Sequence, residues 1–178
     1  MTPINSKLEI ISAIKDSGLR AQSWFLAIPA KDFFHREGAA WSASDNVDHI
    51  IKAIKPVAKA LGLPKLALQT MFAKPENPSR TYNEICSIYR AEIAKGAQAS
   101  GTFLPDQTPP ANPEEKKAEL LSLLDNIMEK LITAVEKWDD KELDEAQLPH
   151  PILGKLTLRE MLYFTIYHNL RHASQEGD

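Results

Sequence analysis

Two histidines near the carboxyl end, His168 and His172, stand four residues apart in a segment with helical periodicity. This spacing puts both imidazoles on one helical face, with Cβ atoms roughly 6 Å apart, which is close enough for two ligands of one metal ion. The segment is too apolar for a solvated surface, and an unpaired buried polar group costs roughly 1–3 kcal/mol. The pair is therefore expected to bind a metal or to hydrogen bond inside the core, and the spacing alone favours the core.

A third histidine, His49, lies near the start of another expected helix. It stands across the helical wheel from the apolar stripe of Val47, Ile50 and Ile54. An amphipathic helix buries its apolar stripe and exposes the opposite face. Periodicity alone therefore predicts that His49 points to solvent.

The other side chains that could do chemistry carry weaker signals. His35 has polar neighbours in a loop, which predicts a surface position. His150 sits between two prolines, which predicts a structural role, with a reach to the pocket as the less favoured alternative. Cys86 lies on an apolar stripe without a neighbouring cation, as expected of an inert core thiol. The sequence has no glycine-rich nucleotide-binding motif, P-loop or nucleophile elbow.

Three motifs together resemble one known family. Residues 41–49 read W-S-x-x-D-x-x-x-H, residues 150–160 read H-P-x-x-G-x-L-T-L-R-E, and residues 167–175 read Y-H-N-L-R-H-A-S-Q. These motifs, and the order of the expected helices, resemble the DinB-like superfamily, which includes the YfiT-type proteins and thiol S-transferases. The resemblance extends over nearly the whole chain.

The resemblance implies a divalent metal held by three histidines, which correspond here to His49, His168 and His172. Zinc or nickel is the first expectation for the metal, and iron or manganese is the alternative. Three neutral imidazoles leave coordination positions open for water or substrate, as in catalytic sites. The implied activity is that of a hydrolase or a thiol S-transferase acting on a small molecule.

Three further side chains are predicted near such a site. Asp45, one turn before His49, is placed to accept the second N–H of that imidazole, as carboxylates near metal sites often do, although an ordinary capping carboxylate is the alternative. Glu176 stands in the same relation to His172, but a surface carboxylate is the better interpretation there. Trp41 is expected either to cover the pocket or to act as a hydrophobic staple at the helix start.

Caps and hydrophobic periodicity predict five helices that would position these residues. They run from Ser6 to Pro29, from Ala43 to Gly62, from Thr81 to Gly96, from Asn112 to Trp138, and from Thr157 toward the carboxyl end. Pro56 lies inside the second helix and predicts a kink or an early end, because proline lacks the N–H that the helix needs. The period of residues 66–73 is ambiguous.

No segment alternates polar and apolar residues as a half-buried strand does. We therefore predict an all-α fold, a four-helix bundle of the DinB/YfiT-like type with a short accessory helix, formed by a single domain over residues 1–178. The last helix is apolar on nearly every side and is expected to lie deep in the structure.

Composition restricts the partners and the compartment. The 178 residues carry 21 Lys and Arg against 24 Asp and Glu, a net charge of -3, so no overall positive field attracts phosphate and we expect no nucleic-acid partner. The longest apolar run, near residues 24–30, is far shorter than the ~20 residues of a membrane span, so no membrane association is expected. One cysteine and no signal-peptide pattern predict a cytoplasmic protein. A homodimer is also expected, because helical bundles with exposed apolar edges often pair.

Two functional hypotheses follow. The first is a metal-dependent enzyme in which the ion activates water or a low-molecular-weight thiol. The alternative is a non-catalytic metal-binding or interaction bundle linked to the stress response. An open coordination position suits both hypotheses.

Overall fold

Reciprocal capping boxes begin the helices where the sequence predicts them. The Ser42 and Thr81 side chains each accept a hydrogen bond from the backbone N–H three residues later, and the side chain of that later residue accepts one in return. Thr157 and Glu160 exchange the same pair of bonds, at 3.0 and 3.1 Å. Each box satisfies backbone donors that a helix start leaves unpaired, so all three predicted starts are confirmed.

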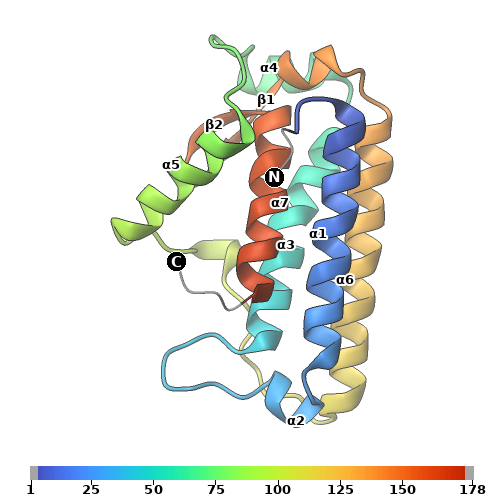
Figure 1. Cartoon of the computed structure of the whole chain (residues 1–178), viewed down its shortest axis with the longest axis vertical. Helices are drawn as coiled ribbons and strands as arrows, with labels where there is room; N and C mark the ends of the chain where they lie inside the picture. The colour runs from blue at the N-terminus through green and yellow to red at the C-terminus, as the bar shows by residue number, and fades with distance from the viewer. Residues whose placement is uncertain (1–3, 175–178) are drawn as a thin grey trace.

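The computed structural model describes residues 4–174, and four long helices run along its longest dimension (Figure 1). They are α1 (Lys7–Ala27), α3 (Ala43–Leu61), α6 (Pro113–Glu136) and α7 (Leu158–Ser174). α1 packs against α6 and α7, and α3 packs against the same two helices. The hydrophobic core lies between these helices, and α7 is buried continuously from Leu158 to Ile166, as its all-round apolar character predicts.

Shorter elements connect the long helices. They are α2 (Ala30–Phe33), α4 (Lys65–Phe72), α5 (Tyr82–Ala94) and the 3-10 turns η1 (Gly101–Phe103) and η2 (Lys141–Asp144). α4 is the segment whose period is ambiguous in the sequence. α5 packs against α7, and η1 contacts α3, so both elements lie beside the faces of α3 and α7 that carry histidines.

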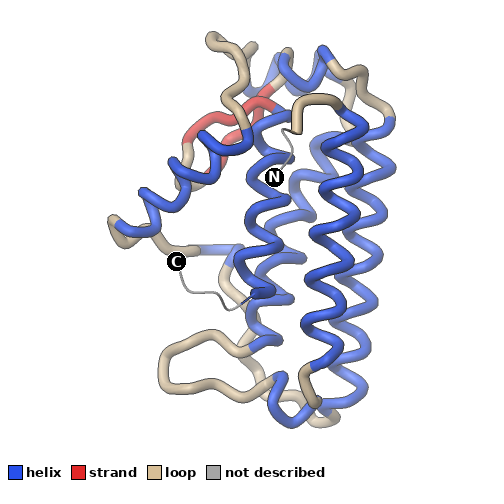
Figure 2. Tube along the Cα trace, in the orientation of Figure 1, coloured by secondary structure: helices blue, strands red, loops and turns tan. Residues whose placement is uncertain are grey.

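The absence of strands was a wrong prediction. β1 (Gln147–His150) and β2 (Gly154–Thr157) form an antiparallel hairpin beside α5, drawn in red in Figure 2. Each strand has only four residues, too few for an alternating pattern of polar and apolar residues to be recognised. Pro149 also disfavours a strand in the sequence, although proline is tolerated in an edge strand. The fold is mostly helical, as predicted, with this small sheet added.

The early end at Pro56 was also wrong, because α3 continues to Leu61. Pro56 is exposed, while Ile54 and Val57 on either side of it are buried. Packing of these neighbours holds the helix across the missing backbone hydrogen bond. Among the described residues no helix is long and apolar enough to span a bilayer.

Candidate metal centre

Three histidines from two helices converge at one place in the core. His49 comes from α3, and His168 and His172 come from successive turns of α7. One ring nitrogen of each lies within 4.8 Å of the others. The structure therefore brings together the three side chains that the resemblance singled out.

His49 does not point to solvent as periodicity predicts. Its side chain is 6% exposed, because α3 contacts α6 and α7 and is covered by η1 as well. The prediction from helical periodicity assumes that the face opposite the apolar stripe is in solvent. α3 instead has neighbours on more than one side, so that face is covered as well. The prediction of an exposed His49 was therefore wrong.

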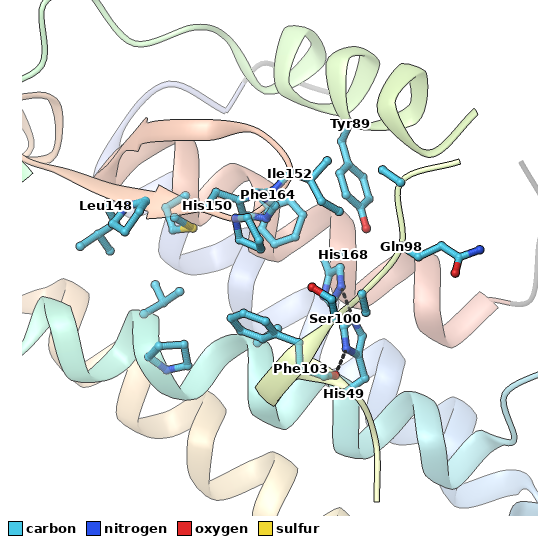
Figure 3. Close-up of a pocket in the computed structure, with 18 of the residues that line it drawn as sticks. His49, Tyr89, Gln98, Ser100, Phe103, Leu148, His150, Ile152, Phe164 and His168 are labelled. Atoms are coloured by element: carbon cyan, nitrogen blue, oxygen red, sulfur yellow. Dashed lines mark hydrogen bonds between the residues drawn. The ribbon is translucent and has the colours of Figure 1, made fainter. Parts of the chain in front are cut away.

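Hydrogen bonds fix the tautomers of two of the rings. His49 Nδ1 lies 2.8 Å from the Phe103 carbonyl oxygen, which only accepts, so this nitrogen carries the hydrogen (Figure 3). His172 Nδ1 lies 2.6 Å from Asn46 Oδ1, and the Asn46 amide is oriented by its own N–H donated to the Ser42 carbonyl at 2.9 Å. Both rings therefore present an unprotonated Nε2 to the cluster.

These Nε2 atoms fit a metal ion. His49 Nε2 lies 3.0 Å from His168 Nε2, and His172 Nε2 is buried without a hydrogen-bond partner among the described residues. An unsatisfied buried nitrogen costs roughly 1–3 kcal/mol. Two ligands of one cation with metal–nitrogen bonds of about 2.1 Å lie at most about 4.2 Å apart. The His49–His168 pair meets this limit, with the ion replacing their hydrogen bond, and the third nitrogen, within 4.8 Å of both, needs only a small shift. The donor set is thus suited to a divalent ion.

Electrostatics keep the three rings neutral. Burial lowers the pKa of His49 and lowers that of His168 well below its usual range, and neighbouring positive charge adds to the effect at His168. Burial, followed by the neighbouring His49 and Arg171, lowers the pKa of His172 to about 3. Neutral imidazole is the form that binds metals, so the site needs no deprotonation at neutral pH.

Trp41 packs over the histidines. Its ring centroid lies 4.9 Å from that of His49 and 6.1 Å from that of His172, nearly parallel to the latter. Of the two interpretations of Trp41, the structure supports the pocket cover.

Asp45 does not contact the His49 ring, and its predicted role as the partner of that imidazole was wrong. It makes two hydrogen bonds with Arg36, at 2.6 and 2.7 Å, and one with the Ser42 N–H at 2.9 Å. Burial alone would raise the pKa of Asp45, but these bonds outweigh it and the pKa is lowered. The Asp45 carboxylate is thus occupied by Arg36 and the Ser42 N–H at the start of the helix. The Phe103 carbonyl, and not Asp45, accepts the hydrogen bond from His49 Nδ1. Glu176 lies outside the described residues.

A large apolar cavity extends from the histidines between α3, α5 and the hairpin (Figure 3). Its volume is about 1210 Å³, above the usual 300–1,000 Å³ of small-molecule sites. Aromatic and aliphatic side chains dominate the lining, among them Tyr89, Phe103, Ile152 and Phe164. An elongated molecule could therefore lie with one end at the histidines.

His150 also lines this cavity, so its position is not only structural. The centroid of its ring lies 4.3 Å from that of the Phe164 ring, and the Phe164 centroid lies 4.9 Å from that of His168. His35 is exposed and Cys86 is buried with its pKa raised by burial, as predicted for a surface histidine and an inert thiol.

Sequence reasoning missed Asn46 and Phe103, and for His150 it favoured the structural role over the reach to the cavity that the structure shows. Asn46 carries a weak signal, since it lies one turn before His49 on the same helix. Phe103 carries none, because it contributes a backbone carbonyl from a distant loop.

Comparisons with known proteins concern the family and the fold of the chain. The family model of the DinB superfamily matches residues 13–175. The chain is also similar to the colibactin self-resistance protein ClbS, solved in complex with a double-stranded DNA, at 17% identity over 98% of this chain and 95% of that chain, with a TM-score of 0.54. At that identity the likeness concerns the fold. No curated protein matches the chain.

The ClbS complex corrects one prediction. Nucleic acid was excluded on the net charge of -3, yet a protein of this fold is seen in complex with DNA. Net charge describes the whole chain and does not reveal the local surface that a duplex would contact. The exclusion of a nucleic-acid partner was therefore wrong.

Proposed function

This chain belongs to the DinB superfamily, and we propose that it is a cytoplasmic metal-dependent enzyme that acts on a small molecule by hydrolysis or thiol transfer. One observation carries the proposal. The buried His172 Nε2, which has no hydrogen-bond partner in the described part of the chain, lies beside two other imidazoles at one end of a large apolar cavity.

His49, His168 and His172 would hold the ion between α3 and α7, inside a four-helix bundle. Zinc or nickel is the preferred ion, with iron or manganese as alternatives. A divalent ion held there supplies a Lewis acid that lowers the pKa of water or of a thiol. Phe103 and Asn46 keep the Nδ1 hydrogens of His49 and His172 turned away from the cluster.

The lining of the cavity supports a nucleophile that comes from outside the chain. Among the described residues, no carboxylate and no cysteine lines it. Its serine, Ser100, is exposed and makes no hydrogen bond with a described histidine that could act as its base. The chain's own contribution is to bind the substrate, to exclude water with Trp41 and the apolar walls, and to hold three neutral imidazoles in place. Water or a low-molecular-weight thiol is the nucleophile that this arrangement needs.

Metal content tests the proposal. Protein purified without a histidine tag should contain about one divalent ion per chain, and His168→Ala should lose it. Because an ion bound only by the folded form stabilises it by about 2.7 kcal/mol at one hundred times its Kd, a chelator should lower the wild-type melting temperature. The same chelator should leave His168→Ala nearly unchanged, and equal shifts in both proteins would contradict the assignment.

Catalysis is tested separately. A screen of low-molecular-weight thiols against small electrophiles should reveal conjugation that His168→Ala lacks. Bound metal without turnover would favour the alternative, a non-catalytic metal-binding bundle.

Binding of double-stranded DNA is a second candidate, favoured by the likeness to ClbS in its DNA complex. Fluorescence anisotropy with a labelled duplex would test it, and true binding should weaken steeply between about 50 and 200 mM salt because released counterions drive it. A duplex that stays unbound at the lower salt would eliminate this candidate.

A further inference from the structure

His150 presents a hydrogen-bond donor to the cavity at a fixed place. It is the last residue of β1 and pairs with Gly154, which holds a φ of +74° in the hairpin turn. Its Nδ1 accepts hydrogen bonds from the backbone N–H groups of Ile152 and Leu153, at 3.2 and 3.0 Å. Both nitrogen-to-nitrogen contacts require an Nδ1 without hydrogen, so the hairpin turn itself sets the tautomer.

The other ring nitrogen is therefore the donor. Burial lowers the pKa of His150 to about 4, so the ring is neutral at physiological pH and its one hydrogen resides on Nε2. No described residue hydrogen bonds to this Nε2, and the ring packs edge-on against Phe164 on the cavity wall (Figure 3). The donor is held by the turn behind it and by the aromatic side chain beside it.

The surroundings of this donor restrict what it can bind. The lining is mostly apolar. Of its two cations, Lys59 is exposed and the Arg171 guanidinium lies over the Tyr89 ring, 5.9 Å from the ring centroid. Burial alone lowers the pKa of His150, so neither cation acts on this donor. Burying a charged ligand group against a neutral N–H and apolar walls would be costly. A neutral acceptor such as a carbonyl oxygen fits the donor without that cost.

We propose that His150 binds the substrate, donating its Nε2–H to a neutral carbonyl-type oxygen of an elongated, mainly apolar molecule whose reacting end lies at His49, His168 and His172. The inference rests on the proposed function in one respect, namely that this cavity is the substrate site of the metal centre. The Phe164 ring contacts both His150 and His168. A substrate oxygen bound by His150 would therefore be separated from the three metal-binding histidines by the width of this one aromatic ring.

Two probes matched in length test the donor directly. In 4-phenyl-2-butanone a carbonyl replaces one methylene of butylbenzene, and both can be measured by displacement of the fluorescent dye N-phenyl-1-naphthylamine. The two probes differ in hydration, but this difference is the same for every variant. A change in the ratio of their dissociation constants between variants therefore reports only the contacts that the protein makes. His150→Asn keeps an acceptor for the turn N–H groups, as in an Asx turn, but has no donor at the Nε2 position.

We expect His150→Asn to reduce the preference for the ketone over the hydrocarbon about five- to tenfold, the loss of one hydrogen bond. His150→Gln, whose amide N–H reaches the Nε2 position, should recover most of that preference. Ile152→Ala removes apolar lining only and should weaken both probes equally.

An unchanged ratio in His150→Asn, or a wild type that binds neither probe, would overturn the inference. Metal content of the same variant separates the two proposals, since His150 is not one of the three metal-binding histidines. A wild type without metal that still prefers the ketone through His150 would count against the metal centre and for the donor. A His150→Asn variant that binds metal and keeps the wild-type ratio of ketone to hydrocarbon affinity would support the metal centre and count against the donor.

Discussion

At the scale of single residues, the metal-binding form of His172 depends on one amide oxygen. Asn46 Oδ1 accepts from His172 Nδ1 and so keeps Nε2 free of hydrogen. Loss of such a partner typically costs 10–100-fold in metal affinity. We expect Asn46→Ala to weaken metal binding by that factor, measured by competition with a chromophoric chelator. Asn46→Asp retains an acceptor and should bind nearly as well as the wild type, and equal affinity in all three proteins would contradict this role.

His150 gives the stability of the protein a defined pH dependence. Its pKa is about 4 in the folded chain against 6.5 for an unperturbed histidine, because burial disfavours the charged ring. Below pH 6.5 the unfolded chain binds a proton that the folded chain does not, so this contribution to the free energy of unfolding declines until about pH 4. The slope is at most about 1.4 kcal/mol per pH unit.

Urea denaturation in the presence of a chelator, from pH 7 to pH 4, measures this effect. Relative to His150→Asn, the wild type should lose stability as the pH falls through that window. Parallel pH profiles for the two proteins would show that His150 is accessible to protons in the folded state.

The site residues differ in how far sequence could predict them. The shared face of His168 and His172 follows from their spacing, since residues four apart on a helix lie on the same side. His49 does not, because its burial depends on which neighbours surround α3, and helical periodicity carries no such information. The family resemblance supplied what periodicity lacked. Phe103 acts through its carbonyl, which every residue possesses, so no side-chain pattern could identify it.

At the scale of elements, the start of α3 is held by a charged network that also orders the preceding loop. Asp45 is fully buried and binds both Arg36 and the Ser42 backbone. Removing a cap and a charged hydrogen bond together should lower the free energy of unfolding by about 2–3 kcal/mol in Asp45→Ala. Metal content should be unchanged, because Asp45 does not contact His49.

Asp16→Ala is the matched control for this prediction. Asp16 pairs with Arg20 on the exposed face of α1, with more than half of each side chain in solvent, so its loss should barely alter the unfolding curve. Loss of metal from Asp45→Ala at full folding would instead restore the role that the sequence suggested for it.

The elements themselves were largely predictable from local signals. Capping boxes and apolar spacing act within one turn, which is why the starts of α3, α5 and α7 agree with the sequence. The hairpin depends on pairing between two short segments, and the continuation of α3 through Pro56 depends on tertiary packing. Both depend on contacts that local patterns do not contain.

At the scale of the whole molecule, the homodimer stays a prediction, and α1 offers a surface for it. Leu8, Leu19 and Leu26 are 74%, 69% and 63% exposed. Their spacings of eleven and seven residues are close to whole helical turns, so the three lie along one face of α1. A closed two-fold dimer would cover this face on both copies at once, because the same patch meets itself across the axis.

Leu19→Lys tests this arrangement, since it places one charge near the middle of the face in each copy. Desolvating and opposing two ammonium groups should weaken the dimer at least tenfold, which sedimentation equilibrium would measure. The unfolding curve of the dissociated chain should be nearly unaffected, because Leu19 is mostly in solvent. Leu66→Lys, at an equally exposed leucine on α4, should leave the association constant unchanged. A wild type that sediments as a monomer at high concentration, or a Leu19→Lys variant that still pairs as strongly, would show that α1 does not form the dimer interface.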